Sequence, residues 1–157
     1  MFLLIENMQI KFLIILIINI IFSSTKINSD IVILSTSNVH GEIEPCGWKK
    51  KPLGGLARKA TIIDKIKSEG IDPIIVDSGN LFFKTNKPVI GLNNEINEIN
   101  AETIVESFNI IGCDAFAVGE NDLSNGLEYL IKINNNANFP FLSANIVDKS
   151  NNLIFNP

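Results

Sequence analysis

Short apolar runs alternate with longer amphipathic segments along most of this chain. The short runs are rich in β-branched and aromatic residues and predict buried strands at 31–36, 73–77, 115–118 and 141–144. The longer segments have apolar residues at helical spacing and predict helices at 56–69, 101–111 and 127–133. Strands that alternate with helices favour an α/β fold with a mostly parallel sheet.

The segments between these elements are polar or rich in glycine and proline. The segment 37–55 contains Pro45, Pro52 and four glycines, which predicts a long loop. The polar stretch 84–99 predicts a loop or a short irregular element. Gly70 and Gly112 follow two of the predicted helices and mark their ends.

The N-terminal segment 1–29 has the pattern of a signal peptide. Phe12 to Phe22 is an apolar run of 11 residues preceded by Lys11, which is too short for a comfortable membrane span. Cleavage within 23–29 would leave 30–157 as the folded domain. We therefore expect export to the periplasm or the cell exterior. An uncleaved membrane anchor is the alternative.

Composition narrows the range of partners. The formal net charge is −4 and no basic stripe is present, so the sequence does not favour binding to a nucleic acid polymer. The leader is the only segment that predicts a membrane contact. Cys46 and Cys113 follow the leader with no spacing rule joining them, and we expect two independent thiols.

Polar turns follow each of the first three predicted strands. They are Asn38–Val39–His40–Gly41, Asp77–Ser78–Gly79–Asn80 and Gly119–Glu120–Asn121–Asp122. The carboxyl ends of parallel strands share one edge of a sheet, so these turns are expected to lie near one another. A metal or phosphate site fits this pattern, and so do tight strand-to-loop turns without further function.

Four longer segments carry a resemblance to a known family. They are Gly54–Ala60, Ile75–Phe82, Ile111–Gly119 and Asn138–Asn145. In their order and residue identities they resemble the N-terminal half of a calcineurin-like metallophosphoesterase, in particular the 5′-nucleotidase group. The resemblance extends from about Asp30 to Pro157. The resemblance implies the N-terminal portion of a layered α/β sandwich with a mostly parallel sheet, truncated at Pro157.

The same resemblance implies a two-metal site. In the family, divalent ions such as Mn, Zn, Co or Fe activate a water that hydrolyses a phosphate ester. The family's ligands come as Asp-x-His, Gly-Asp and Gly-Asn-His. At the matching positions this chain has Asn38 and His40, then Asn80, then Glu120 and Asn121, followed by Asp122. The resemblance thus assigns metal binding to Asn38, His40, Asn80 and Glu120, and catalysis to Asn121 and Asp122.

The replaced ligands weaken this assignment. Two divalent ions bring four positive charges, and hard cations prefer anionic oxygen ligands. Neutral Asn80 stands where the family has a bridging carboxylate, and Glu120 restores one negative charge from a different position. We therefore expect weakened metal binding and impaired hydrolysis.

The loop after His40 resembles a subgroup of exported family members. Those proteins carry Pro-Cys-Gly-Cys in this loop and Gly-Glu-x-Asp in the third turn. Here Cys46 keeps the first thiol as a candidate for redox chemistry or for a soft metal, and Trp48 occupies the second position. A loop aromatic that packs on the sheet edge is the favoured interpretation of Trp48. A UGA codon read as selenocysteine is the alternative, and a UGG codon would remove it.

Together these observations predict an exported metallophosphoesterase-like protein related to 5′-nucleotidases. Its substrate would be a nucleotide or another small phosphate ester. Two alternatives stay open at the level of the sequence. One is a non-catalytic descendant that uses its thiol or a soft metal. The other is an incomplete fragment whose C-terminal half is separately encoded.

Overall fold

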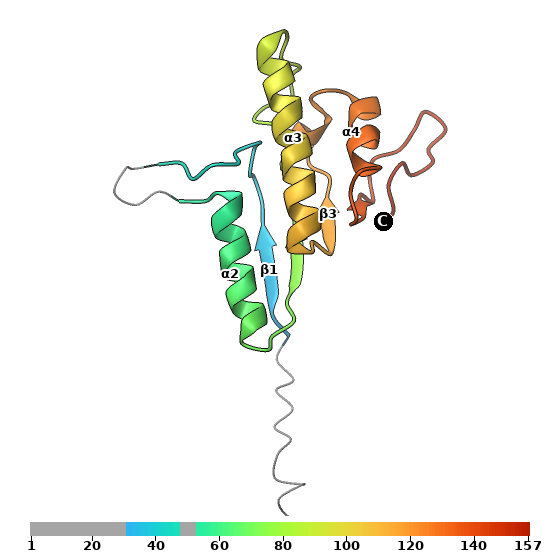
Figure 1. Cartoon of the computed structure of the whole chain (residues 1–157). Helices are drawn as coiled ribbons and strands as arrows, with labels where there is room; N and C mark the ends of the chain where they lie inside the picture. Colours follow the sequence, from blue (N-terminus) through green and yellow to red (C-terminus); the bar gives the residue numbers. More distant parts are fainter. Residues whose placement is uncertain (1–30, 48–52) are drawn as a thin grey trace, which may run out of the picture. The chain divides into compact units, whose positions relative to one another are not determined.

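The computed structural model describes residues 31–47 and 53–157 (Figure 1). The predicted signal peptide and Trp48 lie outside the described residues. In the described ranges, no helix is long and apolar enough to cross a membrane.

A four-stranded parallel sheet forms the centre of the domain. The strands are β1 (Ile33–Thr36), β2 (Ile74–Asp77), β3 (Ala115–Ala117) and β4 (Phe141–Leu142), and they lie in the order β1-β2-β3-β4. This confirms the predicted α/β class with a parallel sheet. Because every pair is parallel, the loops that follow β1, β2 and β3 leave from the same edge of the sheet.

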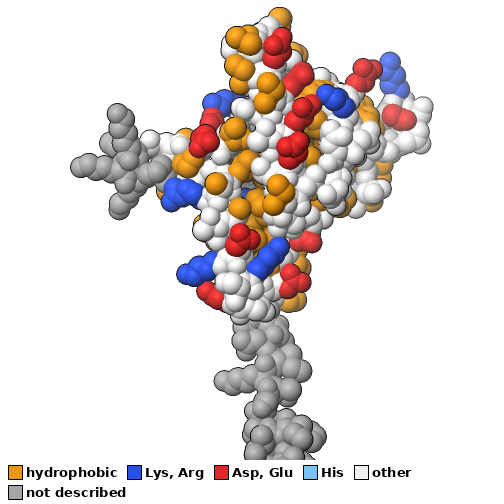
Figure 2. Space-filling model, viewed as in Figure 1, with side chains coloured by type: hydrophobic (Ala, Val, Ile, Leu, Met, Phe, Trp, Pro, Cys, Tyr) orange, Lys and Arg blue, Asp and Glu red, His pale blue; other side chains and the backbone are white. Residues whose placement is uncertain are grey.

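Three helices and one short 3₁₀ helix connect the strands. They are α2 (Leu56–Ser68), α3 (Leu92–Ile111), η1 (Glu120–Leu123) and α4 (Leu127–Asn134). The strand order always advances in one direction, so right-handed crossovers place all three α-helices on one face of the sheet. Figure 1 shows the long helix α3 in front of the strands, and Figure 2, viewed from the same side, shows hydrophobic and acidic side chains mixed on this face. Ile63 of α2, Ile75 of β2 and Ile111 of α3 pack together on this face.

Helix α3 corrects one sequence prediction. The stretch 84–99 is predicted to be a loop or a short irregular element, but α3 begins at Leu92 and runs for 20 residues. Its first turns are rich in asparagine, a poor helix former, and this conceals the helix in the sequence. Within those turns the Asn94 amide donates a hydrogen bond to the Glu98 carboxylate at 2.8 Å, a contact one turn apart that supports the helix.

The core contains a group of phenylalanines that also anchors the second polar turn. The Phe116 ring of β3 lies 5.2 Å from the Phe82 ring and 4.7 Å from the Phe141 ring, both edge to face. Phe82 comes two residues after Asn80 and is 1 % exposed. Its burial therefore fixes the chain directly after the turn that carries Asn80.

Candidate functional site

The turns after β1 and β2 are joined by backbone hydrogen bonds. The Asn38 amide donates to the Gly79 carbonyl, the His40 amide to the Asn80 carbonyl and the Gly41 amide to the Leu81 carbonyl, each at 2.9 Å. These contacts continue the pairing of β1 and β2 beyond the strands. They place Asn38, His40 and Asn80 on neighbouring segments at one edge of the sheet.

The side chain of Asn80 connects all three turns. Its Nδ2 donates to Asn38 Oδ1 at 2.9 Å, and its Oδ1 accepts the backbone N–H of Asn121 at 3.0 Å. Asn38, Asn80 and Asn121, which the sequence assigned to one site, are therefore brought together. We call these three residues the amide network.

Backbone conformation at this edge is unusual. Asn38, His40 and Asn80 have φ values of 53°, 57° and 53°, in the left-handed region that side-chain-bearing residues rarely adopt. Asparagine tolerates this region better than most residues. Such strained positions cluster at ligand-binding and active sites, so the backbone independently marks this edge as a candidate site.

Gly119 makes the close approach of the third turn possible. A Cβ atom built at Gly119 would lie 2.5 Å from both the backbone N and the Oδ1 of Asn80. Any larger residue would therefore push the second and third turns apart and break the contact between Asn80 and Asn121.

Asp122 lies beneath the amide network. It is fully buried, and its carboxylate accepts backbone N–H groups from Gly119 at 2.8 Å and from Asn80 and Phe82 at 2.9 Å each. Burial raises the pKa of this carboxyl, while the backbone hydrogen bonds oppose that rise. Because its oxygens are enclosed and bonded to the backbone, Asp122 holds the turns in place.

Glu120 and the Asn121 amide turn toward the loop after β2. Asn86 Nδ2 donates to Glu120 Oε1 at 2.5 Å, and Asn121 Nδ2 donates to the Lys84 carbonyl at 3.1 Å. The Lys84 ammonium in turn pairs with Glu42, two residues after His40. Sequence reasoning missed Lys84 and Asn86, because nothing in a polar loop indicates which turn it contacts.

A second polar group supports the strand ends from the helix side, and the sequence pointed to only one of its members, Asp77. Thr36 Oγ1 donates to Asp77 Oδ2 at 2.6 Å and accepts a hydrogen bond from Lys59 Nζ at 3.0 Å. Asp77 Oδ1 accepts the Gly79 N–H at 3.0 Å, which fixes the turn that leads to Asn80. Burial lowers the pKa of Lys59 and raises the pKa of Asp77. The Lys59 ammonium also lies 3.8 Å from the centre of the Phe108 ring.

Both thiols are free, as the sequence predicted. Cys46 is exposed and pairs with Leu53 through backbone hydrogen bonds. Cys113 is buried, and burial raises its pKa to about 11, so it is protonated and unreactive at neutral pH.

These residues do not fit a pair of divalent ions. Among residues 31–47 and 53–157, no group of three or more His, Cys, Asp or Glu side chains is placed to hold a metal ion. The Asn80 amide stands where the resemblance expects a bridging carboxylate, and both its ends are already hydrogen-bonded. His40 is the only imidazole. The described chain therefore supplies too little negative charge to bind two such ions at this edge.

Comparison with known proteins identifies similar sequences. No family model matches the chain. It is 34 % identical to a 5′-nucleotidase of Vibrio vulnificus over 76 % of this chain and 20 % of that protein. It is 35 % identical to protein UshA of Salmonella pullorum over 76 % of this chain and 20 % of that protein. The chain thus spans about a fifth of the length of these curated relatives.

Solved structures show the same fold. The calcineurin-like phosphoesterase YfkN of Bacillus subtilis aligns with a TM-score of 0.62 and 23 % identity, over 81 % of this chain and 40 % of that one. A putative 5′-nucleotidase of Staphylococcus aureus aligns with a TM-score of 0.63 and 21 % identity, over 80 % of this chain and 25 % of that one. At these identities the likeness establishes the fold alone.

Proposed function

Because the chain belongs to the 5′-nucleotidase type of N-terminal domain in the calcineurin-like metallophosphoesterase superfamily, we propose that it binds nucleotide phosphate esters and hydrolyses them poorly. The binding place is the sheet edge that carries Asn38, His40 and Asn80. Several of the curated relatives that it matches are named 5′-nucleotidases, which is the basis for proposing a nucleotide as the ligand.

The amide network is the observation that carries the proposal of impaired hydrolysis. In the family, the position of Asn80 holds a carboxylate that shields two metal ions from each other. Here a neutral amide fills that position and bonds both neighbouring turns. Turns that already bond one another through amides do not need ions to hold them together.

Two side chains remain available to a phosphate ester at this edge. Asn38 is exposed, and its Nδ2 donates to Ser37 Oγ at 3.4 Å, which leaves its second N–H for a ligand. His40 is half-buried without a side-chain hydrogen bond among the described residues. An amide N–H and an imidazole N–H are both donors to phosphate oxygens. Such contacts bind an anion but do not generate a hydroxide nucleophile.

Export is the second part of the proposal. The apolar run 12–22 and the preceding Lys11 support it. A fusion of residues 1–40 to a reporter enzyme that is active only outside the cytoplasm tests it. Reporter activity is expected, and its absence would contradict export.

Restoring the family's ligands tests the proposed chemistry. We compare the wild-type chain with a triple variant, Asn38→Asp, Asn80→Asp and Asn121→His, and with His40→Ala. Binding of AMP is measured by calorimetry. Release of phosphate and metal content are measured with Mn²⁺, Co²⁺ and Zn²⁺.

The wild type is expected to bind AMP, to release almost no phosphate and to gain nothing from metal. His40→Ala is expected to weaken AMP binding, and the triple variant to retain more metal after dialysis. Phosphate release by the wild type that requires both metal and His40 would refute impaired hydrolysis. A wild type that does not bind AMP would refute the proposed ligand.

A further inference from the structure

The outer side of α3 carries a row of exposed apolar side chains, which we call the α3 stripe. It consists of Leu92, Ile96, Ile99 and Ile110, and their side chains are between 46 % and 85 % exposed. Successive members are separated by spacings that return to the same side of a helix, and Thr103 lies between the last two on that side. The buried residues of α3 lie on its other side and are Ala101, Ile104, Val105, Phe108 and Ile111. The stripe therefore faces away from the core along about five turns of helix.

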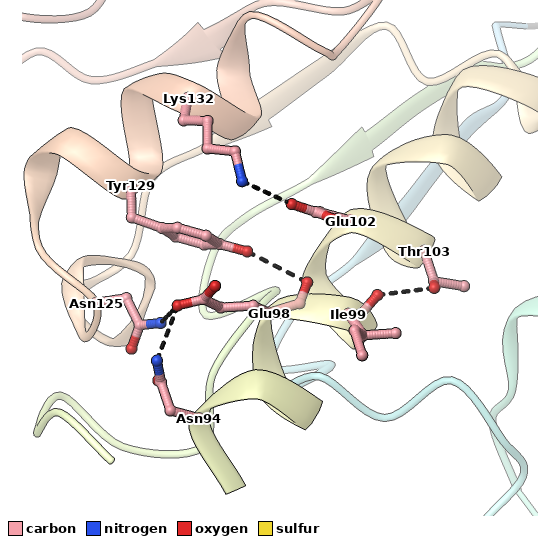
Figure 3. A network of polar contacts seen from close by, with 8 residues as sticks. All are labelled: Asn94, Glu98, Ile99, Glu102, Thr103, Asn125, Tyr129 and Lys132. Carbon is pink, nitrogen blue, oxygen red and sulfur yellow. Dashed lines mark hydrogen bonds and ion pairs between the residues drawn. The ribbon is translucent and has the colours of Figure 1, made fainter. Parts of the chain in front are cut away.

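A line of carboxylates borders the α3 stripe. Glu95, Glu102 and Glu106 follow one another at helical spacing along one side of it. Glu102 pairs with Lys132 of α4 at 3.0 Å (Figure 3). Glu95 and Glu106 are exposed, and no ion pair holds either of them among the described residues. Figure 2 shows hydrophobic and acidic side chains together over this helix. Two negative charges thus remain beside the stripe.

These charges restrict what can cover the stripe. Rows of exposed apolar side chains that are bordered by polar ones mark surfaces that bind another molecule. The sequence of α3 contains four glutamates and no lysine or arginine, so a second copy of α3 would bring like charges together at the same contact. An anionic lipid surface is disfavoured for the same reason. A partner with positive charge beside an apolar surface complements both features.

We propose that the α3 stripe docks a basic amphipathic helix of a partner protein. The apolar side of that helix packs on Leu92, Ile96 and Ile99, as two helices pack through their apolar sides. Lysine or arginine at the border of the partner helix pairs with Glu95 and Glu106. Neither α3 glutamate takes part in the amide network, so this docking does not depend on the proposed nucleotide binding.

Titration of the full chain with fluorescent synthetic helices, followed by anisotropy, tests the proposal. The first peptide has 18 residues, about the length of the stripe, with leucine on one side of the helix and lysine on the other. The second peptide has glutamate at every lysine position. The third has the composition of the first in an order that gives no apolar side.

Two double variants of the chain remove the two features separately. Glu95→Gln with Glu106→Gln removes the free border charges, and Ile96→Gln with Ile99→Gln interrupts the stripe. Their matched controls alter exposed residues of α2 and of the segment that follows it. These controls are Asp64→Asn with Glu69→Gln, and Ile62→Gln with Ile71→Gln. Far-UV circular dichroism reports whether each variant folds.

The lysine peptide is expected to bind the wild type at least about tenfold more tightly than either other peptide. The two glutamate changes should weaken it about fivefold and the two isoleucine changes at least about tenfold, because the first remove exposed ion pairs and the second remove apolar contact. Both control variants should bind it like the wild type.

Three results of the peptide titration would overturn the proposal. They are no binding to the wild type, equal binding of the scrambled or glutamate peptide, and a control variant that loses as much affinity as its matched α3 variant. Two results without peptide would also overturn it by assigning another occupant. A wild type that sediments as a larger species than the stripe variant would indicate a second copy. Binding to phosphatidylcholine vesicles that the stripe variant loses would indicate a membrane.

Discussion

At the scale of single residues, the described turns depend on two buried carboxyl groups with different tasks. Asp122 accepts backbone N–H groups from the second and third turns, and Asp77 accepts the Thr36 hydroxyl and the Gly79 amide. Both are buried, and burial raises the pKa of each above the ordinary value of 3.8. They set the positions of the turns through hydrogen bonds that few other side chains could supply in the same space.

The raised pKa of Asp77 predicts a specific pH dependence of stability. The folded chain holds the Asp77 proton at pH values at which the unfolded chain has already lost it. The proton therefore contributes its full stabilisation below about pH 3.8, and this contribution is lost as the pH rises through the raised pKa of the folded state. Replacing Asp77 by Asn removes the titration. The free energy of unfolding, measured by urea denaturation from pH 3.5 to 7, should therefore fall less with pH in Asp77→Asn than in the wild type.

The control for this experiment is Asp72→Asn, which changes an exposed carboxyl in the loop before β2. Its pH profile should follow the wild type. A profile for Asp77→Asn that falls as steeply as the wild type would contradict the assignment of the raised pKa to Asp77.

At the scale of elements, the sequence predicted those helices and strands that have a strong apolar pattern and clear turn residues at their ends. The predicted helix 56–69 agrees with α2 within one residue, and the strand 73–77 agrees with β2 within one residue. Both have strong apolar patterns bounded by glycine or proline. The first part of α3 was missed because its turns are rich in asparagine, a poor helix former, although Leu92, Ile96 and Ile99 have helical spacing.

The candidate site, too, was predictable from the sequence only in part. The convergence of the three turns followed from parallel strands alone. The pairing of Asn86 with Glu120 and of Lys59 with Thr36 depends on how loops and helices pack over long sequence separations. No local pattern in one sequence encodes such contacts.

Helix α3 predicts a sharp contrast between two isoleucines. Ile104 is fully buried against the sheet, whereas Ile110, on the same helix, is 85 % exposed. Ile104→Ala should lower the free energy of unfolding by about 2–5 kcal/mol, because it removes buried methyl groups and leaves a cavity. Ile110→Ala should change it by less than about 0.5 kcal/mol. Urea denaturation of both variants measures the contrast, and equal effects would contradict the placement of α3.

At the scale of the whole described domain, the sheet has two different faces. Helices cover the face that carries Ile75 and Phe116, both fully buried. On the opposite face Ile33 and Ile74 are neighbours in the register of β1 and β2, and they are 61 % and 44 % exposed. β1 is also an edge strand, and exposed apolar edges favour association between chains.

This exposed face predicts self-association of the chain. The double variant Ile33→Lys and Ile74→Lys should sediment as a smaller species than the wild type at the same concentration, because two lysines on this face oppose its burial against another chain. Ile110→Lys is the matched control, since it places a lysine at an exposed isoleucine of α3, and it should sediment like the wild type. All three proteins keep residues 1–30, so any contribution of that segment is the same in each. A wild type that stays monomeric, or a control that dissociates as fully as the double variant, would show that this face does not drive association.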